Sequence, residues 1–172
     1  EAILSHERII EEEMQFLVNV ETVTGIQNLD AIAEAVSNSQ YVSGIVFGRV
    51  DFVRSQGLER DSVDSDDCLH AALRVASACQ AANLSFVVGG AISFSSGDFL
   101  AELARVKLTR FETRKVVFDA ERLAKAGLTA LLTAALDFEL TWLGSKRDHY
   151  QTISSEDTSR IQMLEARLGE DR

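Results

Sequence analysis

Proline is missing from the chain of 172 residues, although average usage of about 5% predicts about eight or nine. The sequence itself gives no physical reason for this absence. Long basic runs are missing too. No basic run is longer than Lys146–Arg147, and acidic residues outnumber Lys and Arg by 27 to 17, for a net charge of −10. Because nucleic acids and anionic membranes bind cationic faces, we expect neither as a partner.

Membrane spans and disulfides are also absent from the sequence pattern. No apolar run approaches the roughly 20 residues that a membrane-spanning helix needs, and the chain opens with no signal-peptide pattern. The two cysteines, Cys68 and Cys79, fall on one predicted helix about three turns, or roughly 16 Å, apart, so they cannot bond each other. These features predict a cytoplasmic protein with reduced thiols.

What is present is a sizeable core and a repeating strand–helix pattern. Hydrophobic residues make up 46% of the chain, which is enough for one folded domain. The apolar period switches repeatedly between short continuous runs and spacing near 3.6. Strands are predicted at 16–21, 43–48, 84–90 and 109–118. The first three are apolar nearly throughout, as in parallel strands covered on both faces, so the expected fold class is α/β.

Helices are predicted between and after these strands. An apolar stripe covers 26–36, a helix capped by Ser65 covers 65–82, a short helix lies near 96–105, and the residues up to Gln15 are also typical of helix. Residues 119–146 predict one long helix interrupted only by Gly127, and Ser154 with Asp157 predicts the start of another. We therefore expect two parts, 1–118 with the strand–helix units and 119–172 as a helical extension that forms a homo-oligomer.

Two acidic residues stand where functional groups gather in parallel α/β proteins, at the ends of consecutive strands. Glu21 ends the run LVNVE, and Asp51 follows the run GIVFG. If these strands are neighbours, about 4.8 Å apart, both carboxylates can bind one ion. Hard oxygen ligands suit Mg²⁺ or Mn²⁺. The alternative is that Glu21 caps the next helix and Asp51 is a turn residue.

The stretches VETVTGIQNLDAIAEA and VSGIVFGRVDFVRSQG resemble the HpcH/HpaI aldolase and citrate lyase β-subunit family, over roughly residues 14–118. The resemblance implies a (β/α)₈ TIM barrel, of which this chain supplies about the last four units. It also implies that Glu21 and Asp51 hold Mg²⁺ or Mn²⁺, and that the turn formed by Gly48, Arg49 and Val50 positions a substrate carboxylate. The implied activity is that of a metal-dependent carbon–carbon lyase or aldolase, acting on a pyruvate-like 2-keto acid or an acyl-CoA through a metal-stabilised enolate.

The turn departs from the family pattern, which has small residues or proline where this chain has Arg49 and Val50. Arg49 is interpreted either as a group that grips an extra substrate carboxylate or phosphate, or as a surface cation. Arg110, Glu112 and Arg114 are predicted to share one face of the fourth strand. Arg114 is a candidate substrate ligand there, and the alternative is an internally paired ionic stripe.

The catalytic residues themselves cannot be assigned. The family keeps its substrate-gripping arginine, and in the aldolase branch its catalytic histidine, in the first four units, which we expect upstream. His6, His70 and His149 do not fall at strand ends and are predicted to be structural or solvated. The turn Gly89–Ser93 is a further place where backbone approaches a ligand. The rival hypothesis is a non-catalytic α/β module that kept the fold, lost the site and works through its C-terminal helices.

Overall fold

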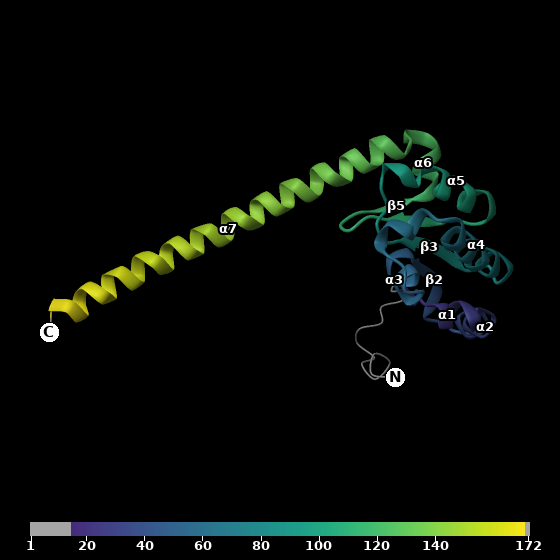
Figure 1. The fold of residues 1–172 in the computed structure, drawn as a ribbon, viewed down its shortest axis with the longest axis horizontal. Coiled ribbons are helices and arrows are strands. Elements are labelled where there is room, and N and C mark those ends of the chain that lie inside the picture. The colour runs from purple at the N-terminus through teal and green to yellow at the C-terminus, as the bar shows by residue number, and fades with distance from the viewer. Residues whose placement is uncertain (1–14, 171–172) are drawn as a thin grey trace. The chain divides into compact units, whose positions relative to one another are not determined.

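A computed structural model describes residues 15–170 (Figure 1). It divides into two compact units, with the boundary between Leu132 and Thr133, and each is described by itself. The first contains a five-stranded sheet whose spatial order follows the chain. The strands are β1 (Phe16–Val20), β2 (Val42–Gly48), β3 (Ser85–Gly89), β4 (Arg110–Glu112) and β5 (Val117–Asp119).

The first four strands are parallel, as the sequence predicts, and consecutive strands are neighbours. In β1 and β2, Val20 is the partner of Phe47, and in β2 and β3, Gly48 is the partner of Gly89. Each of β1, β2 and β3 is followed by helix, so the turns that leave these three strands lie at one edge of the sheet. This edge is the place where parallel α/β proteins assemble their sites.

The prediction of one strand over 109–118 is wrong. The segment forms an antiparallel hairpin of β4 and β5, in which Phe111 is the partner of Phe118 and the two rings stack 5.2 Å apart. The Thr113 amide donates to the Val116 carbonyl at 2.8 Å, and the Thr113 hydroxyl also bonds Val116. This hydroxyl supplies a tight turn without glycine or proline.

The helices of the first unit are α1 (Val23–Gln27), α2 (Leu29–Ser37), α3 (Arg49–Ser55), α4 (Asp66–Ala81), α5 (Gly97–Val106) and α6 (Ala120–Ala126), with 3₁₀ turns η1 (Arg60–Asp64) and η2 (Phe94–Ser96). Two of them, α4 and α5, match the helices predicted over 65–82 and 96–105, whereas α3 was not predicted. Ser65 caps α4, as predicted, by accepting a hydrogen bond from the Cys68 amide at 3.3 Å. The expected helix over 26–36 is two helices, because Asn28 ends α1 and precedes α2. The helix predicted up to Gln15 lies outside the described residues.

The core lies between the sheet and helices α4 and α5. Alternate residues of the strands face these helices and are fully buried, namely Ile45, Phe47, Phe86, Val88 and Phe111. The other face of the sheet is more open. Asn19, in the middle of β1, is exposed, and Val46, Arg110 and Glu112 are only partly buried. Residues on that open face alternate with the core residues and reach the sheet edge at Glu21, Gly48, Gly89 and Glu112.

The C-terminal helices differ from the prediction in two ways. Gly127, with a φ of +77°, ends α6, so 119–146 is not one helix. A single helix, α7 (Leu128–Glu170), then runs for 43 residues, and the predicted start at Ser154 is wrong (Figure 1). Hydroxyl side chains near the predicted start do not cap a new helix there. They donate to backbone carbonyls four residues back in α7, as Thr152 does to Asp148 and Thr158 does to Ser154. Such bonds are compatible with a continuing helix.

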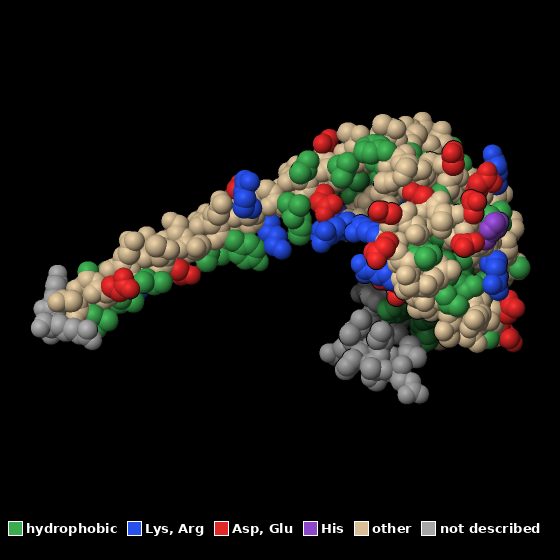
Figure 2. All heavy atoms as spheres, in the orientation of Figure 1, with side chains coloured by type: hydrophobic (Ala, Val, Ile, Leu, Met, Phe, Trp, Pro, Cys, Tyr) green, Lys and Arg blue, Asp and Glu red, His purple; other side chains and the backbone are tan. Residues whose placement is uncertain are grey.

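The residues after Leu132 form the second unit, which in the described chain is the remainder of α7. Figure 2 shows hydrophobic side chains exposed along α7 among charged ones. The exposed large ones are Leu136, Phe138, Leu140, Trp142, Leu143, Tyr150, Ile153, Ile161, Met163, Leu164 and Leu168. Within 15–170, no single helix is long and apolar enough to cross a membrane, and α6 with α7 meets that test only as a bent pair.

Candidate metal and substrate site

Four residues form a row across the carboxyl ends of the parallel strands. The register that pairs Val20 with Phe47 brings Glu21 beside Gly48. Gly48 pairs with Gly89, and Gly89 in turn lies beside Glu112 of β4. The row therefore has a carboxylate at each end and two residues without side chains between them. The space above the two glycines is taken by the side chains of Glu21 and Glu112, which a Cβ atom on either glycine would meet.

Glu21 lies directly over the first of these glycines. A Cβ atom on Gly48 would stand 2.7 Å from Glu21 Oε2 and 3.0 Å from its Cβ, so only glycine leaves this carboxylate its position. The Asn19 side-chain amide donates a long hydrogen bond to Glu21 Oε2 at 3.4 Å. The alternative that Glu21 caps the next helix is wrong, because the Thr22 hydroxyl accepts from the Gly25 amide and caps α1.

Asp51 lies in the first turn of α3, so the alternative of a simple turn residue is also wrong. Its side chain is 59% exposed and makes a loose ion pair with Arg54 at 3.9 Å, where both partners are solvated. Such a pair is worth little and leaves the carboxylate available to a cation. Asp51 comes three residues after Gly48, and Gly48 contacts Glu21. Glu21 thus follows β1 directly, and Asp51 lies in the first helical turn after the neighbouring strand β2.

These oxygens fit a divalent metal of a particular kind. Within residues 15–170, no cluster of three or more His, Cys, Asp or Glu side chains could hold an ion by itself. Two carboxylates suit Mg²⁺ or Mn²⁺, which keep several waters and take further oxygens from substrate, and not a metal that needs a full protein cage. The assignment of Glu21 and Asp51 to a metal stays a prediction.

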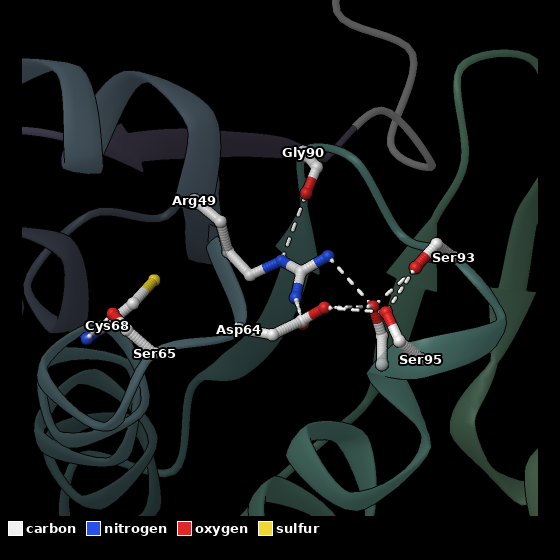
Figure 3. Close-up of polar contacts among 8 residues, drawn as sticks. Arg49, Asp64, Ser65, Cys68, Gly90, Ser93 and Ser95 are labelled. Atoms are coloured by element: carbon white, nitrogen blue, oxygen red, sulfur yellow. Dashed lines mark hydrogen bonds and ion pairs between the residues drawn. The ribbon is translucent and has the colours of Figure 1, made fainter. Parts of the chain in front are cut away.

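The Arg49 side chain points toward Asp64 and the Gly90 carbonyl (Figure 3). It is fully buried, so the surface-cation alternative is wrong. Its Nη1 binds Asp64 Oδ1 at 2.5 Å, its Nε donates to the Gly90 carbonyl at 3.0 Å, and its Nη2 approaches the Ser96 hydroxyl at 3.4 Å. Burial lowers the pKa of Arg49, and neighbouring Asp64 partly opposes that shift. A direct grip on substrate would require the guanidinium to leave these partners.

The backbone of the same turn faces the loop after β3. Gly90, with a φ of +89°, comes so close that a Cβ there would stand 2.9 Å from the Val50 nitrogen and 3.1 Å from the Arg49 nitrogen. Ala91 also has a positive φ, of 53°. The predicted approach of the Gly89–Ser93 backbone is therefore an approach to the turn that begins at Gly48. The roles of Gly48, Arg49 and Val50 in binding substrate stay predictions.

Glu112 is the residue of the row that the sequence reasoning did not single out as a ligand. A Cβ on Gly89 would stand 2.6 Å from Glu112 Cγ, and burial raises the pKa of the Glu112 carboxyl. The predicted strand over 109–118 places Glu112 in mid-strand, so only the observed end of β4 at Glu112 identifies it. The predicted three-charge face is wrong, because Arg114 lies in the hairpin turn and is exposed. Arg110 does lie on the open face, where its Nε is buried without a hydrogen-bond partner in the described chain.

Other reactive side chains lie away from this edge. Cys68 and Cys79 are both buried in α4 without a disulfide, as predicted. His70 lies on α4 and His149 on α7, and neither falls at a strand end, while His6 lies outside the described residues. A hollow between α2 and α4 is lined in part by His70 and Arg74, and a second lies by Thr109 and Arg122, and neither includes a residue of the row.

Comparison with solved structures gives the fold of which this sheet is part. RipC from Yersinia pestis is 16% identical, with a TM-score of 0.51, over 64% of this chain and 50% of that one. An HpcH/HpaI aldolase from Desulfitobacterium hafniense DCB-2 is 14% identical, with a TM-score of 0.46, over 63% of this chain and 43% of that one. The chain thus spans about half the length of these proteins, and its α/β fold is that of a partial TIM barrel. A comparison with curated proteins finds no match.

A family model covers most of the sheet-containing unit. The model described as HpcH/HpaI aldolase/citrate lyase matches residues 1–117, which include both predicted metal ligands and the turn between them. The resemblance predicted from the two strand-end motifs is thereby confirmed. This chain belongs to the HpcH/HpaI aldolase/citrate lyase family.

Proposed function

We propose that this chain carries the metal-binding half of a carbon–carbon lyase or aldolase that depends on Mg²⁺ or Mn²⁺. The observation that carries the proposal is the placement of Glu21 against Gly48, three residues before Asp51, at the ends of two neighbouring parallel strands. Membership of an aldolase and citrate lyase family supports the reaction class. The substrate we propose is a pyruvate-like 2-keto acid or an acyl-CoA with a carboxylate.

Each residue of the proposed site has a separate role in this reaction. A bound divalent ion supplies Lewis-acid stabilisation of the enolate that forms when the carbon–carbon bond is made or broken. Glu21 and Asp51 supply two negative oxygen ligands. The amides of Arg49 and Val50, at the start of α3, are proposed to orient the substrate carboxylate, and Gly90 keeps side-chain atoms away from them. Arg114 is proposed to contact substrate from the hairpin turn.

Binding of Mn²⁺ tests the metal part of the proposal directly. The amide variants Glu21→Gln and Asp51→Asn keep the size of each side chain and remove its charge, so each is expected to bind Mn²⁺ far more weakly than the parent protein while staying folded. Glu102→Gln is a matched control, because Glu102 is a partly exposed glutamate that pairs with Arg105 on the same helix. Affinity equal to that of the parent protein in both site variants would overturn the proposed metal site.

We also propose that α7 mediates a cytoplasmic homo-oligomer. The support is the large hydrophobic side chains that α7 exposes. Extended exposed apolar surface of this kind typically marks an interface with another protein. The rival, a non-catalytic module that associates through α7, shares this feature and differs in needing no metal. Removing the chain beyond Phe118 should lower the assembly state measured by sedimentation. A folded truncated protein with unchanged oligomer size would contradict the assembly proposal.

A further inference from the structure

The side chain of Arg49 joins three segments that are distant in the sequence. From the start of α3 it reaches Asp64 at the end of η1, the Gly90 carbonyl after β3, and Ser96 at the end of η2 (Figure 3). Its guanidinium carbon also lies 4.7 Å from the centre of the Phe99 ring. Asp64 is held from its other side, because Oδ2 accepts from the Ser95 hydroxyl at 3.0 Å. The arginine is thus fixed in one position by partners on every side.

Stability alone is a poor reason for such an arrangement. Taking a guanidinium and a carboxylate out of water costs several kcal/mol for each ion, and a well-packed apolar group of similar size is often as stable or more so. What a buried, fully bonded arginine provides is a fixed geometry among the groups it joins. The groups joined here are the two turns at the carboxyl ends of β2 and β3.

Those two turns are the ones that form the proposed site. The backbone of Arg49 follows Gly48, on which Glu21 rests, and comes two residues before Asp51. On the side toward β3, its nitrogen and that of Val50 face Gly90. The hydrogen bond from Arg49 Nε to the Gly90 carbonyl therefore connects the turn after β2 to the turn after β3.

We propose that Arg49 is a positioning residue, whose buried side chain, held by Asp64 and Ser96, locks the turn carrying Asp51 against the Gly90 turn and so fixes the geometry of metal and carboxylate binding. This inference rests on the proposed function, because it assigns Arg49 a task at that site. It differs from a grip on substrate, since the guanidinium stays in the protein and acts through the backbone it holds.

The test compares Arg49→Met with Arg49→Lys in the whole protein. Two affinities are measured by calorimetry: that for Mn²⁺ alone, and that for pyruvate added to the Mn²⁺-loaded protein. Groups that orient metal ligands typically change affinity by about 10- to 100-fold when lost. We expect Arg49→Met to weaken both affinities by at least about tenfold. Arg49→Lys, which keeps the charge without the fork of three donors, should fall between it and the parent protein.

Arg105→Met is the matched control. Arg105 lies on α5, pairs with Glu102 and is 72% exposed, so its loss removes an arginine ion pair without touching the site. Circular dichroism at the temperature of the binding measurement shows whether each variant is folded. In a folded variant, loss of an arginine that only stabilises the fold would leave the affinities for Mn²⁺ and pyruvate unchanged. If Arg49→Met does not fold, Arg49→Lys and Ser96→Ala decide the question by the same two measurements.

The outcomes separate this inference from the function beneath it. Parent-like affinities in the folded Arg49 variants, together with lost Mn²⁺ binding in Glu21→Gln, would overturn the positioning role and leave the metal site standing. No Mn²⁺ binding by the parent protein would overturn the proposed function, and the positioning role with it. Loss of affinity in Arg49→Met equal to that in Arg105→Met would also overturn the positioning role.

Discussion

Removing either partner of the Arg49–Asp64 ion pair should have very unequal effects on stability. Asp64→Ala leaves a fully buried guanidinium with only the Gly90 carbonyl and the Ser96 hydroxyl. Breaking a buried pair in this way costs about 3–5 kcal/mol. Because the Asp64 side chain is 27% exposed, water reaches part of the vacated space. We therefore expect a loss of about 3 kcal/mol, at the lower end of that range.

Arg49→Met should cost much less. The charge is removed with its desolvation penalty, and Asp64 keeps its bonds from the Ser95 and Ser96 hydroxyls. Besides the ion pair, what is lost is the donor to the Gly90 carbonyl, the 3.4 Å contact with the Ser96 hydroxyl and the contact with the Phe99 ring, while methionine fills most of the space. One unmade hydrogen bond is worth about 1 kcal/mol. The two variants should then differ by about 2 kcal/mol, which is roughly a 30-fold change in the ratio of folded to unfolded protein.

Urea unfolding followed by circular dichroism measures this difference. The double variant Asp64→Ala with Arg49→Met should resemble Arg49→Met alone, because no buried cation remains to be penalised, and a cycle of the four proteins gives the coupling energy. An Arg49→Met variant as unstable as Asp64→Ala, or a double variant whose loss is the sum of both, would refute the argument from desolvation.

Three further predictions concern the row of strand ends and the cysteines. Gly48→Ala places a methyl group 2.7 Å from Glu21 Oε2, so Mn²⁺ affinity should fall by about tenfold or more in calorimetry; unchanged affinity would show that this carboxylate does not bind the metal. Burial raises the pKa of Glu112, so the folded protein disfavours its ionised form and loses stability as the pH rises through that pKa. Glu112→Gln should therefore melt at a higher temperature than the parent protein at neutral pH and at the same temperature in acid, and an equal gap at both pH values would contradict this cause. Burial also raises the pKa of Cys68 to about 12 and that of Cys79 to about 11, so a disulfide reagent should label neither in the folded protein and both in urea; rapid labelling of folded protein would refute it.

The parallel strands could be predicted because their physics is local. Buried parallel strands need continuous apolar runs, and those at 16–21, 43–48 and 84–90 are short, complete and followed by helical spacing. The strand ends then place Glu21 and Asp51 without further information. The family resemblance rested on the ends of the first two of these runs and on the residues that follow each.

The β4–β5 hairpin and the uninterrupted helix α7 were not predicted, because the usual turn and capping residues did not mark where these elements begin and end. The sequence ETRK between Phe111 and Phe118 has no glycine, proline or asparagine, and its turn depends on the Thr113 hydroxyl. In α7, Ser154 carries the signal of a cap, but no glycine or proline lies between Gly144 and Ser154 to end the helix. A capping residue favours a helix start without requiring one, because its hydroxyl can bond inside the helix.

The position of the Arg49 side chain could not be predicted at all. Its partners come 15, 41 and 47 residues later in the chain, at Asp64, Gly90 and Ser96. No periodicity or motif links these positions, since they meet only when the β2 and β3 turns pack together. An arginine beside a strand end has the same local signature whether it faces solvent, substrate or the core.

The central claim is that Glu21 and Asp51 bind one divalent ion, and calorimetric titration of Mn²⁺ tests it most directly. The measurement compares the parent protein with Glu21→Gln, Asp51→Asn and the double variant. The account predicts one site per chain in the parent protein, steep loss of affinity in each single variant, and little further loss in the double variant, because both residues serve the same ion. Parent-like affinity in both single variants, or two independent losses that sum in the double variant, would contradict it.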